Sequence, residues 1–118
     1  MFEVSIIMVN VVEAFVQGLE RPIILWLLSQ KPIHGYGLIK ELMRLTGRKL
    51  KPSMIYPFLH SLEKKGFAVG KWVEVNGRNV RYYSLTQRGR SILSGVQDFF
   101  KKPLKEVITD FLLEKRGK

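Results

Sequence analysis

The 118-residue sequence contains no cysteine and only two histidines. The absence of cysteine excludes disulfide bonds, thiolate metal ligands and a cysteine nucleophile, and it is typical of proteins in a reducing cytoplasm. With so few histidines and no cluster of acids, a metal site is not expected. The sequence also lacks a glycine-rich phosphate loop and any motif that groups serine, histidine and acid. We therefore expect no metal, no cofactor and no enzymatic activity.

Acidic residues are also scarce, because ten Asp and Glu stand against twenty Lys and Arg, for a net charge of +10. The excess of basic over acidic residues is confined to one part of the chain. Residues 31–90 hold thirteen basic and three acidic side chains, whereas the rest of the chain holds seven of each. Basic charge confined to one part of a chain is typical of a module that binds a polyanion. The alternative is an ordinary solvated basic surface without a ligand.

Uninterrupted apolar runs are too short to predict a membrane span. The first 17 residues are the most apolar segment, but Glu3, Asn10, Glu13 and Gln17 interrupt them. The segment also lacks the basic region and cleavage site of a signal peptide. We expect a cytoplasmic, nucleoid-associated protein with no membrane partner. Because these polar residues fall on one narrow stripe, residues 3–17 are expected to form a helix that is buried on more than one side.

Glycine and proline divide the chain after this helix. Gly18 permits a break, and Pro22 is suited to the first turn of a second helix over residues 22–30. That helix is apolar almost all round and is expected to form the core, with Trp26 packed inside it.

The next segment reads as a loop, a helix and a basic turn, over residues 31–35, 36–45 and 46–49. Apolar residues recur in the helix at helical spacing and are expected to face the core. They are Leu38, Ile39, Leu42 and Leu45.

A fourth helix is predicted over residues 52–65, with Pro52 at its first position. One stripe of this helix is apolar and is formed by Ile55, Phe58, Leu59 and Leu62. The opposite side is polar or basic, and Gly66 ends the helix. A short turn before a helix with a packed back and a basic front is typical of a helix-turn-helix, whose second helix enters the major groove of DNA. Pro57 removes one backbone hydrogen bond, and we expect a bend that sets how the helix start meets the groove.

After Gly66 the spacing of the apolar residues changes from helical to alternating. This change predicts two strands, over residues 67–75 and 78–85, joined by Asn76-Gly77. This dipeptide is the strongest short signal for a β-hairpin. The two-residue turn predicts that Val75 opposes Arg78, Val73 opposes Val80 and Lys71 opposes Tyr82. Lys71, Arg78 and Arg81 are then expected to cluster on a protruding ribbon that lies along phosphates or in the minor groove. The alternative is a hairpin that only covers the core, and one hairpin can do both.

A last helical region follows Thr86, a good N-cap that lacks the Glu of a capping box because Gly89 occupies that position. Helix is expected over residues 87–101. Pro103 then either kinks it or starts a separate helix that continues to about residue 116. The small core cannot cover the apolar side chains of this region together with those of the first helix, so we expect them to form an interface. The residues expected at this interface are Val11, Phe15, Val96, Phe99, Phe100, Leu104, Val107, Ile108, Phe111 and Leu112.

Three blocks of the sequence, HGYGLIKEL, PSMIYPFLHSLEKKGFAV and RYYSLTQRGRSIL, resemble the PadR family of transcriptional regulators over about residues 18–93. The middle block carries the family pattern at Ser53, Ile55, Tyr56, Pro57, Leu59, Leu62, Glu63 and Gly66, and Gly35-Tyr36 and Arg81 match the blocks on either side. Two features depart from the usual family pattern. Lys51 stands where a capping Ser or Thr is common, and the C-terminal part of about 25 residues is short, as in the smaller subfamily. The resemblance implies a homodimeric, sequence-specific repressor with C-terminal dimerisation helices, and in some members a response to small aromatic compounds.

The combined expectation is a mainly α (α+β) protein, a winged helix-turn-helix with a two-stranded wing and dimerisation helices on both sides. Residues 1–17 form an N-terminal helix that contacts the dimer partner or covers the core, residues 18–90 the DNA-binding domain, and residues 91–118 the C-terminal dimerisation helix. The expected partners are double-stranded DNA, a second copy of the chain and a small aromatic effector bound near Trp26, Trp72 and the dimer helices. The expected DNA contacts are Tyr36, Lys49, Lys51, Ser53, Met54, Tyr56, His60, Lys64, Lys71, Arg78, Asn79 and Arg81.

Lys51 and Ser53 are expected at phosphates, and Met54, His60 and Ser61 are expected at base edges. The front of the helix offers no Arg, Asn or Gln for bidentate base contacts, so DNA shape and backbone contacts are expected to carry much of the affinity. Tyr56 is interpreted as a phosphate contact whose ring packs on the protein, with core filling as the alternative. The function expected is a repressor on a palindromic operator. The alternatives are a winged-helix module for protein or RNA and a nonspecific DNA-coating protein.

Overall fold

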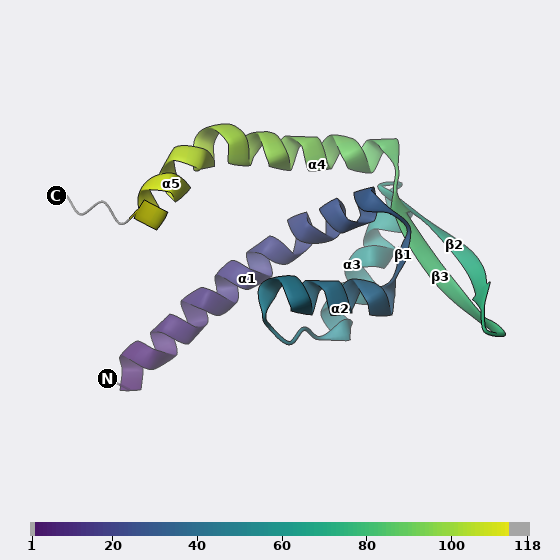
Figure 1. Ribbon diagram of the computed structural model, residues 1–118, viewed down its shortest axis with the longest axis horizontal. Coiled ribbons are helices and arrows are strands. Elements are labelled where there is room, and N and C mark those ends of the chain that lie inside the picture. The colour runs from purple at the N-terminus through teal and green to yellow at the C-terminus, as the bar shows by residue number, and fades with distance from the viewer. Residues whose placement is uncertain (1, 114–118) are drawn as a thin grey trace.

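The computed structural model describes residues 2–113, with side chains from residue 10 onward and that of Ile7. Three helices and a small sheet form the body, a hairpin projects from one side, and a C-terminal helical rod extends away from it (Figure 1). The elements in chain order are α1 (Phe2–Gln30), β1 (Ile33–His34), α2 (Gly35–Thr46), α3 (Pro52–Lys64), β2 (Ala68–Val75), β3 (Arg78–Leu85), α4 (Gln87–Phe99), the π-helical turn η1 (Phe100–Leu104) and α5 (Lys105–Leu113).

Helix α1 is continuous over 29 residues, so the expected break at Gly18 is wrong. Pro22 lies inside the helix, where it removes one backbone hydrogen bond. Burial of Ile24 and Leu28 in the core holds the following turns in place and outweighs that loss. Within the described residues, no helix is long and apolar enough to cross a membrane.

The expectation that Trp26 packs in the core is also wrong, since 43% of its surface is exposed. The core side of α1 is defined by the fully buried Ile24 and Leu28. A residue two positions from each of them lies about 200° around a helix, on the far side. Composition alone makes the helix look apolar all round, but its buried side chains within residues 22–30 lie on one side.

The core lies where the second half of α1 meets α2, α3 and the sheet. Leu38, Ile39 and Leu42 of α2 are buried as predicted, whereas Leu45 is exposed because it lies in the last turn, beyond the last core residue of that helix. The buried apolar side chains are Ile24, Leu25, Leu27, Leu28, Leu38, Ile39, Leu42, Ile55, Leu59, Leu62, Ala68, Tyr83, Leu85 and Leu93.

The sheet has three antiparallel strands in the order β1-β3-β2. Strand β1 falls in the segment expected to be a loop. Its two residues, Ile33 and His34, pair with Tyr83 and Tyr82. Two residues are too few to show a period of two, so this strand depends on β3 being available beside it.

The hairpin has the predicted turn and register. Asn76 and Gly77 have φ of 51° and 78°, which are the left-handed values that the turn requires. The predicted pairs of Val75 with Arg78, Val73 with Val80 and Lys71 with Tyr82 are all present.

The same register separates the wing cations that were expected to cluster. Because paired residues share a face and faces alternate along a strand, Lys71 and Arg78 lie on one face of the sheet. Arg81, paired with Trp72, lies on the other. The expected three-residue cluster is therefore wrong.

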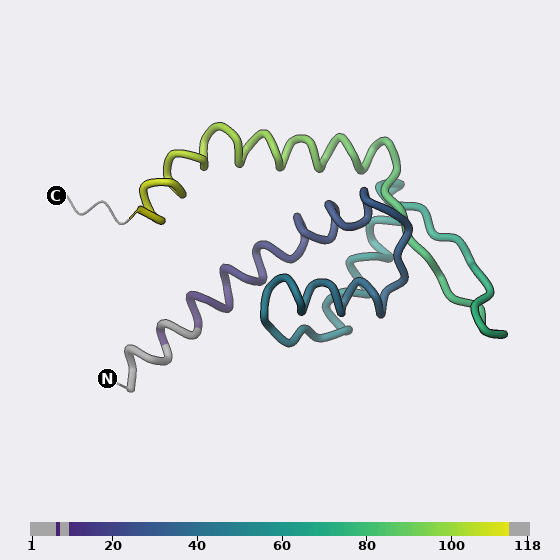
Figure 2. Tube along the Cα trace, viewed as in Figure 1, coloured from purple at the N-terminus to yellow at the C-terminus, as the bar shows by residue number. Residues whose placement is uncertain are grey.

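The C-terminal region is one helical rod with a π-helical turn around Pro103. The turn accommodates the missing N–H of proline, so the chain continues into α5 with a bend (Figure 2). Among the described residues of the rod, Gly89 and Leu93 are buried, and every buried residue lies before the bend.

Two helical projections make the molecule long. It measures 59 × 35 × 22 Å, with a radius of gyration of 17.2 Å, whereas a compact chain of this length has about 13.5 Å. The N-terminal half of α1 and the rod after α4 extend from the body (Figure 1). The predicted boundary between residues 17 and 18 falls inside continuous α1, and the division into three functional parts stays a prediction.

Candidate nucleic-acid interface

Helix α3 has a buried back and an exposed polar front. Ile55, Leu59 and Leu62 are buried against the core at the predicted helical spacing, and Phe58 is half-buried beside them. Lys51 is the N-cap residue and makes no side-chain capping hydrogen bond. In the first turn of α3, Pro52 has no N–H, and the N–H of Met54 donates to the backbone carbonyl of Lys51 at 2.9 Å. The exposed residues of this front are Ser53, Met54, Tyr56, Pro57, His60 and Lys64.

A cleft of about 320 Å³ lies between the start of α2, helix α3 and the wing. Tyr36 and Tyr56 contribute phenolic rings from the two helices, and Arg78, Asn79 and Arg81 come from the wing. The ring of Tyr56 packs so closely on Gly35 that a Cβ atom there would overlap it. Tyr56 therefore packs on the start of α2 while 36% of its surface stays exposed. The cleft brings together hydrogen-bond donors and two guanidinium groups, which are the groups that bind phosphate oxygens.

Lys40 adds a cation beside this cleft. Its Nζ lies 5.6 Å from the ring centroid of Tyr36, four residues earlier on α2. Sequence reasoning missed Lys40, although the i, i+4 spacing on a predicted helix was a signal for this contact.

A second cleft, of about 170 Å³, lies between α1 and the basic turn before α3. Lys49, Lys51 and Met54 line it on one side, and Glu13 and Glu20 line it on the other. Glu20 is buried, and desolvation raises its pKa, with a further increase from Glu13 and an opposing effect from Arg21. The expected DNA contacts in the turn therefore have acidic neighbours on α1, and the polar stripe of α1 lies close to the start of α3.

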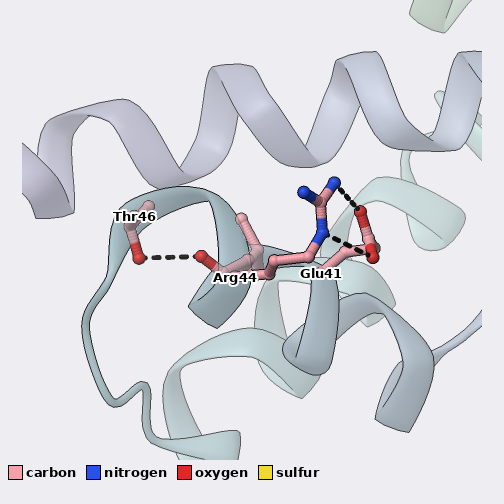
Figure 3. A network of polar contacts seen from close by, with 4 residues as sticks. Glu41, Arg44 and Thr46 are labelled. Atoms are coloured by element: carbon pink, nitrogen blue, oxygen red, sulfur yellow. Dashed lines mark hydrogen bonds and ion pairs between the residues drawn. The ribbon is translucent and has the colours of Figure 1, made fainter.

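The end of α2 is shaped by local polar contacts (Figure 3). Arg44 Nη2 donates to Glu41 Oε1 at 2.8 Å, and Thr46 Oγ1 donates to the carbonyl of Leu42 at 2.7 Å. Gly47 adopts a left-handed φ of 69° and ends the helix. The exposed ion pair contributes little to stability, whereas the hydroxyl and the glycine direct the chain into the basic turn.

Arg81 was expected to contact DNA, but its side chain contacts the protein instead. Its Nη2 donates to Oε2 of Glu63 on α3, and its Cζ lies 5.1 Å from the ring centroid of Trp72. The hydrogen bond to Glu63 raises the pKa of Arg81, and burial raises the pKa of the neighbouring Tyr83. The sequence predicted Arg81 as a DNA contact and missed Glu63 as its partner, although strand parity placed Arg81 on the face opposite Arg78.

The expected dimer residues lie on the N-terminal half of α1 and along the rod. Val96, Phe100 and Leu104 are half-buried and the others are exposed. Phe111 is 77% exposed, the largest value among the exposed large apolar residues described. The structure therefore leaves a long apolar surface uncovered on both projections.

A helix-turn-helix followed by an antiparallel hairpin defines the winged-helix class. Residues 24–94 match the model of the transcriptional regulator PadR-like family. The chain thus belongs to the PadR-like family of transcriptional regulators, as its three sequence blocks predicted.

Individual relatives agree with this assignment. Over 80 residues the chain is 34% identical to the transcriptional regulator Rv3488 of Mycobacterium tuberculosis, covering 68% of this chain and 74% of the relative. A putative transcriptional regulator from Thermoplasma acidophilum has a similar structure, with a TM-score of 0.67, 28% identity and coverage of 88% of this chain and 97% of the other. A PadR family regulator from Eggerthella lenta gives a TM-score of 0.67 at 25% identity, with coverage of 94% and 99%.

Proposed function

We propose that this transcriptional regulator binds a palindromic operator in double-stranded DNA as a homodimer and acts as a repressor. The observation that carries the proposal is the cleft between α3 and the wing, where Tyr36, Tyr56, Arg78 and Asn79 converge beside the exposed front of α3. Donors on both sides of such a cleft can hold one DNA strand while the helix enters the adjacent major groove.

Each part of the front has a proposed role. Lys51 and Ser53, at the start of α3, meet a phosphate, helped by the positive end of the helix dipole. Met54 and His60 approach base edges. Because neither forms a bidentate pair with a base, DNA shape contributes much of the specificity. Lys71 projects from the outer face of the wing toward the backbone or the minor groove, and Arg78 reaches the backbone from the tip of the wing, where it borders the cleft.

Dimerisation is supported by the exposed apolar side chains of α1 and the rod, which would lose contact with water in a second copy's interface. Two α3 helices related by a two-fold axis would read half-sites about 34–36 Å apart, one turn of DNA. Such a dimer on a promoter would exclude polymerase and so repress transcription in the cytoplasm. Binding of a small aromatic effector would be detected by quenching of the fluorescence of the exposed Trp26 and Trp72.

The test is a selection of bound sequences from random duplex DNA, followed by fluorescence anisotropy with the enriched duplex and a scrambled duplex at about 150 mM salt. We expect a two-fold symmetric consensus and a preference of about 10³-fold or more. Arg78→Gln should lower the slope of log K against log salt by about 0.9, because one phosphate contact is lost. Lys102→Gln, an equal charge change on the rod, should leave the slope unchanged.

The alternatives give different results in the same assay. Tight binding without an enriched sequence would indicate a nonspecific coating protein. Absence of duplex binding would favour a winged-helix module for RNA or protein.

A further inference from the structure

Arg81 occupies a defined position between the wing and helix α3. Its guanidinium donates to Glu63, in the last turn of α3, and stacks over Trp72 of β2. The side chains of Arg81 and Glu63 are only 27% and 29% exposed. The guanidinium also lies 6.0 Å from the ring centroid of buried Tyr83. An arginine with an ionic partner, two aromatic neighbours and this much burial is already coordinated by the protein itself.

Moving Arg81 to a DNA phosphate would disrupt this arrangement. Glu63 would lose its partner while remaining partly shielded from water, which is unfavourable for a carboxylate. Lys71 and Arg78 lie on the opposite face of the sheet and are free of this constraint. The geometry therefore distinguishes two classes of wing cation.

We propose that Arg81 is a positioning residue that sets the angle between the wing and α3 through Glu63, and is not itself a phosphate contact. This inference rests on the proposed DNA-binding function. The tip of the wing lies about four residues beyond Arg81, or about 13 Å at the rise of a strand. A rotation of 10° at the bridge would then move the tip by about 2 Å, which is enough to break a hydrogen bond to a phosphate.

Gly70 provides a way to displace Arg81 without changing any charge. A Cβ atom at Gly70 would lie 2.6 Å from Nε and 2.8 Å from Cζ of Arg81. Because the obstacle is the far end of a flexible side chain, Gly70→Ala should push the guanidinium off Glu63 and leave the fold intact. The variant separates loss of position from loss of charge.

The first measurement is the affinity of Arg81→Gln and Gly70→Ala for the selected duplex across a series of salt concentrations. We expect both to weaken binding about tenfold, equivalent to about 1.4 kcal/mol, with a salt slope equal to that of the wild type. A slope lowered by about 0.9 in Arg81→Gln would overturn the proposal, because it would show a lost phosphate contact. Unchanged affinity in Arg81→Gln would overturn it as well.

The second measurement is the affinity of Glu63→Gln for the selected duplex, which shows whether loss of the Glu63 charge weakens or strengthens DNA binding. Glu63→Gln should weaken binding, because the wing loses its anchor, and combination with Arg81→Gln should add little further loss. Glu74→Gln is the matched control. It removes an exposed carboxylate from the face of the wing that carries Arg81, and it should strengthen DNA binding through charge alone.

Stronger binding by Glu63→Gln would show that Glu63 only competes with phosphate for Arg81 and would overturn the proposal. Thermal unfolding of each variant confirms that it is folded at the assay temperature. Failure of the wild type to prefer any sequence would instead refute the proposed function, so the two failures are distinguishable.

Discussion

Glu20 illustrates how the environment of one residue affects stability. Desolvation against α1 and the basic turn raises its pKa above the ordinary value of 4.5, and Glu13 adds to the effect. The unfolded chain loses the proton at about the ordinary value, so the folded state is penalised above the raised pKa, where Glu20 is charged in both states. The penalty disappears below the unfolded pKa, where both states are protonated.

Glu20→Gln should therefore raise the melting temperature at pH 7.5 by removing a partly desolvated charge. The gain should shrink as the pH falls through the raised pKa and should vanish below about pH 4.5. Thermal unfolding of the variant and the wild type at pH 7.5, 5.5 and 4 measures the difference. Glu106→Gln, on exposed α5, is the control for the same charge change. A gain in the Glu20 variant that does not depend on pH would refute this account.

At the scale of elements, the start of α4 is held tightly against the loop between α3 and β2. The hydroxyl of Thr86 accepts the N–H of Gly89 at 3.1 Å, as predicted for its N-cap role, and donates to the carbonyl of Gly66 at 2.7 Å. The N–H of Thr86 donates to the carbonyl of Phe67 at 3.0 Å. The rod therefore begins from a fixed point on the winged-helix body.

Gly89 and Gly95 of the same helix should respond in opposite ways to alanine. A Cβ atom at Gly89 would overlap the backbone carbonyl oxygen of Phe67, whereas nothing lies within 4 Å of one at Gly95. Gly89→Ala should cost about 1–3 kcal/mol because the backbone must move. Gly95→Ala should gain up to about 1 kcal/mol from helix propensity. Urea denaturation measures both values, and equal midpoints for the two variants would contradict the packing at Gly89.

For the whole molecule, the apolar surface on the two projections should determine the oligomeric state. Phe111 is largely exposed in the single chain, so Phe111→Glu should leave the monomer folded while placing a charge in the proposed interface. We expect the sedimentation mass to fall from two chains to one. Affinity for the full palindrome should fall at least tenfold, and affinity for an isolated half-site should remain similar.

Leu45→Glu is the control for mass, because Leu45 is an exposed apolar residue of α2 outside the proposed interface. If the wild-type chain sediments as a monomer at micromolar concentration, the proposed dimer is refuted.

Much of the fold followed from local chemistry. Asn76-Gly77 determines the hairpin and its register, because the two-residue turn requires positive φ at both residues. Thr86 marks the start of a helix, because its hydroxyl accepts a first-turn N–H that has no backbone acceptor within the helix. The apolar stripe of α3 follows from helical period alone. The three sequence blocks, each tied to such local features, were enough to indicate the family.

Other features depend on contacts between segments far apart in the sequence. Core burial on one side keeps α1 continuous through Pro22 and leaves Trp26 exposed, and β3 must be in place before Ile33 and His34 can form a strand. The partner of Arg81 lies 18 residues away on another element. A local pattern shows that a residue is charged and exposed on its own element, but the direction of its side chain is decided by what the fold brings beside it.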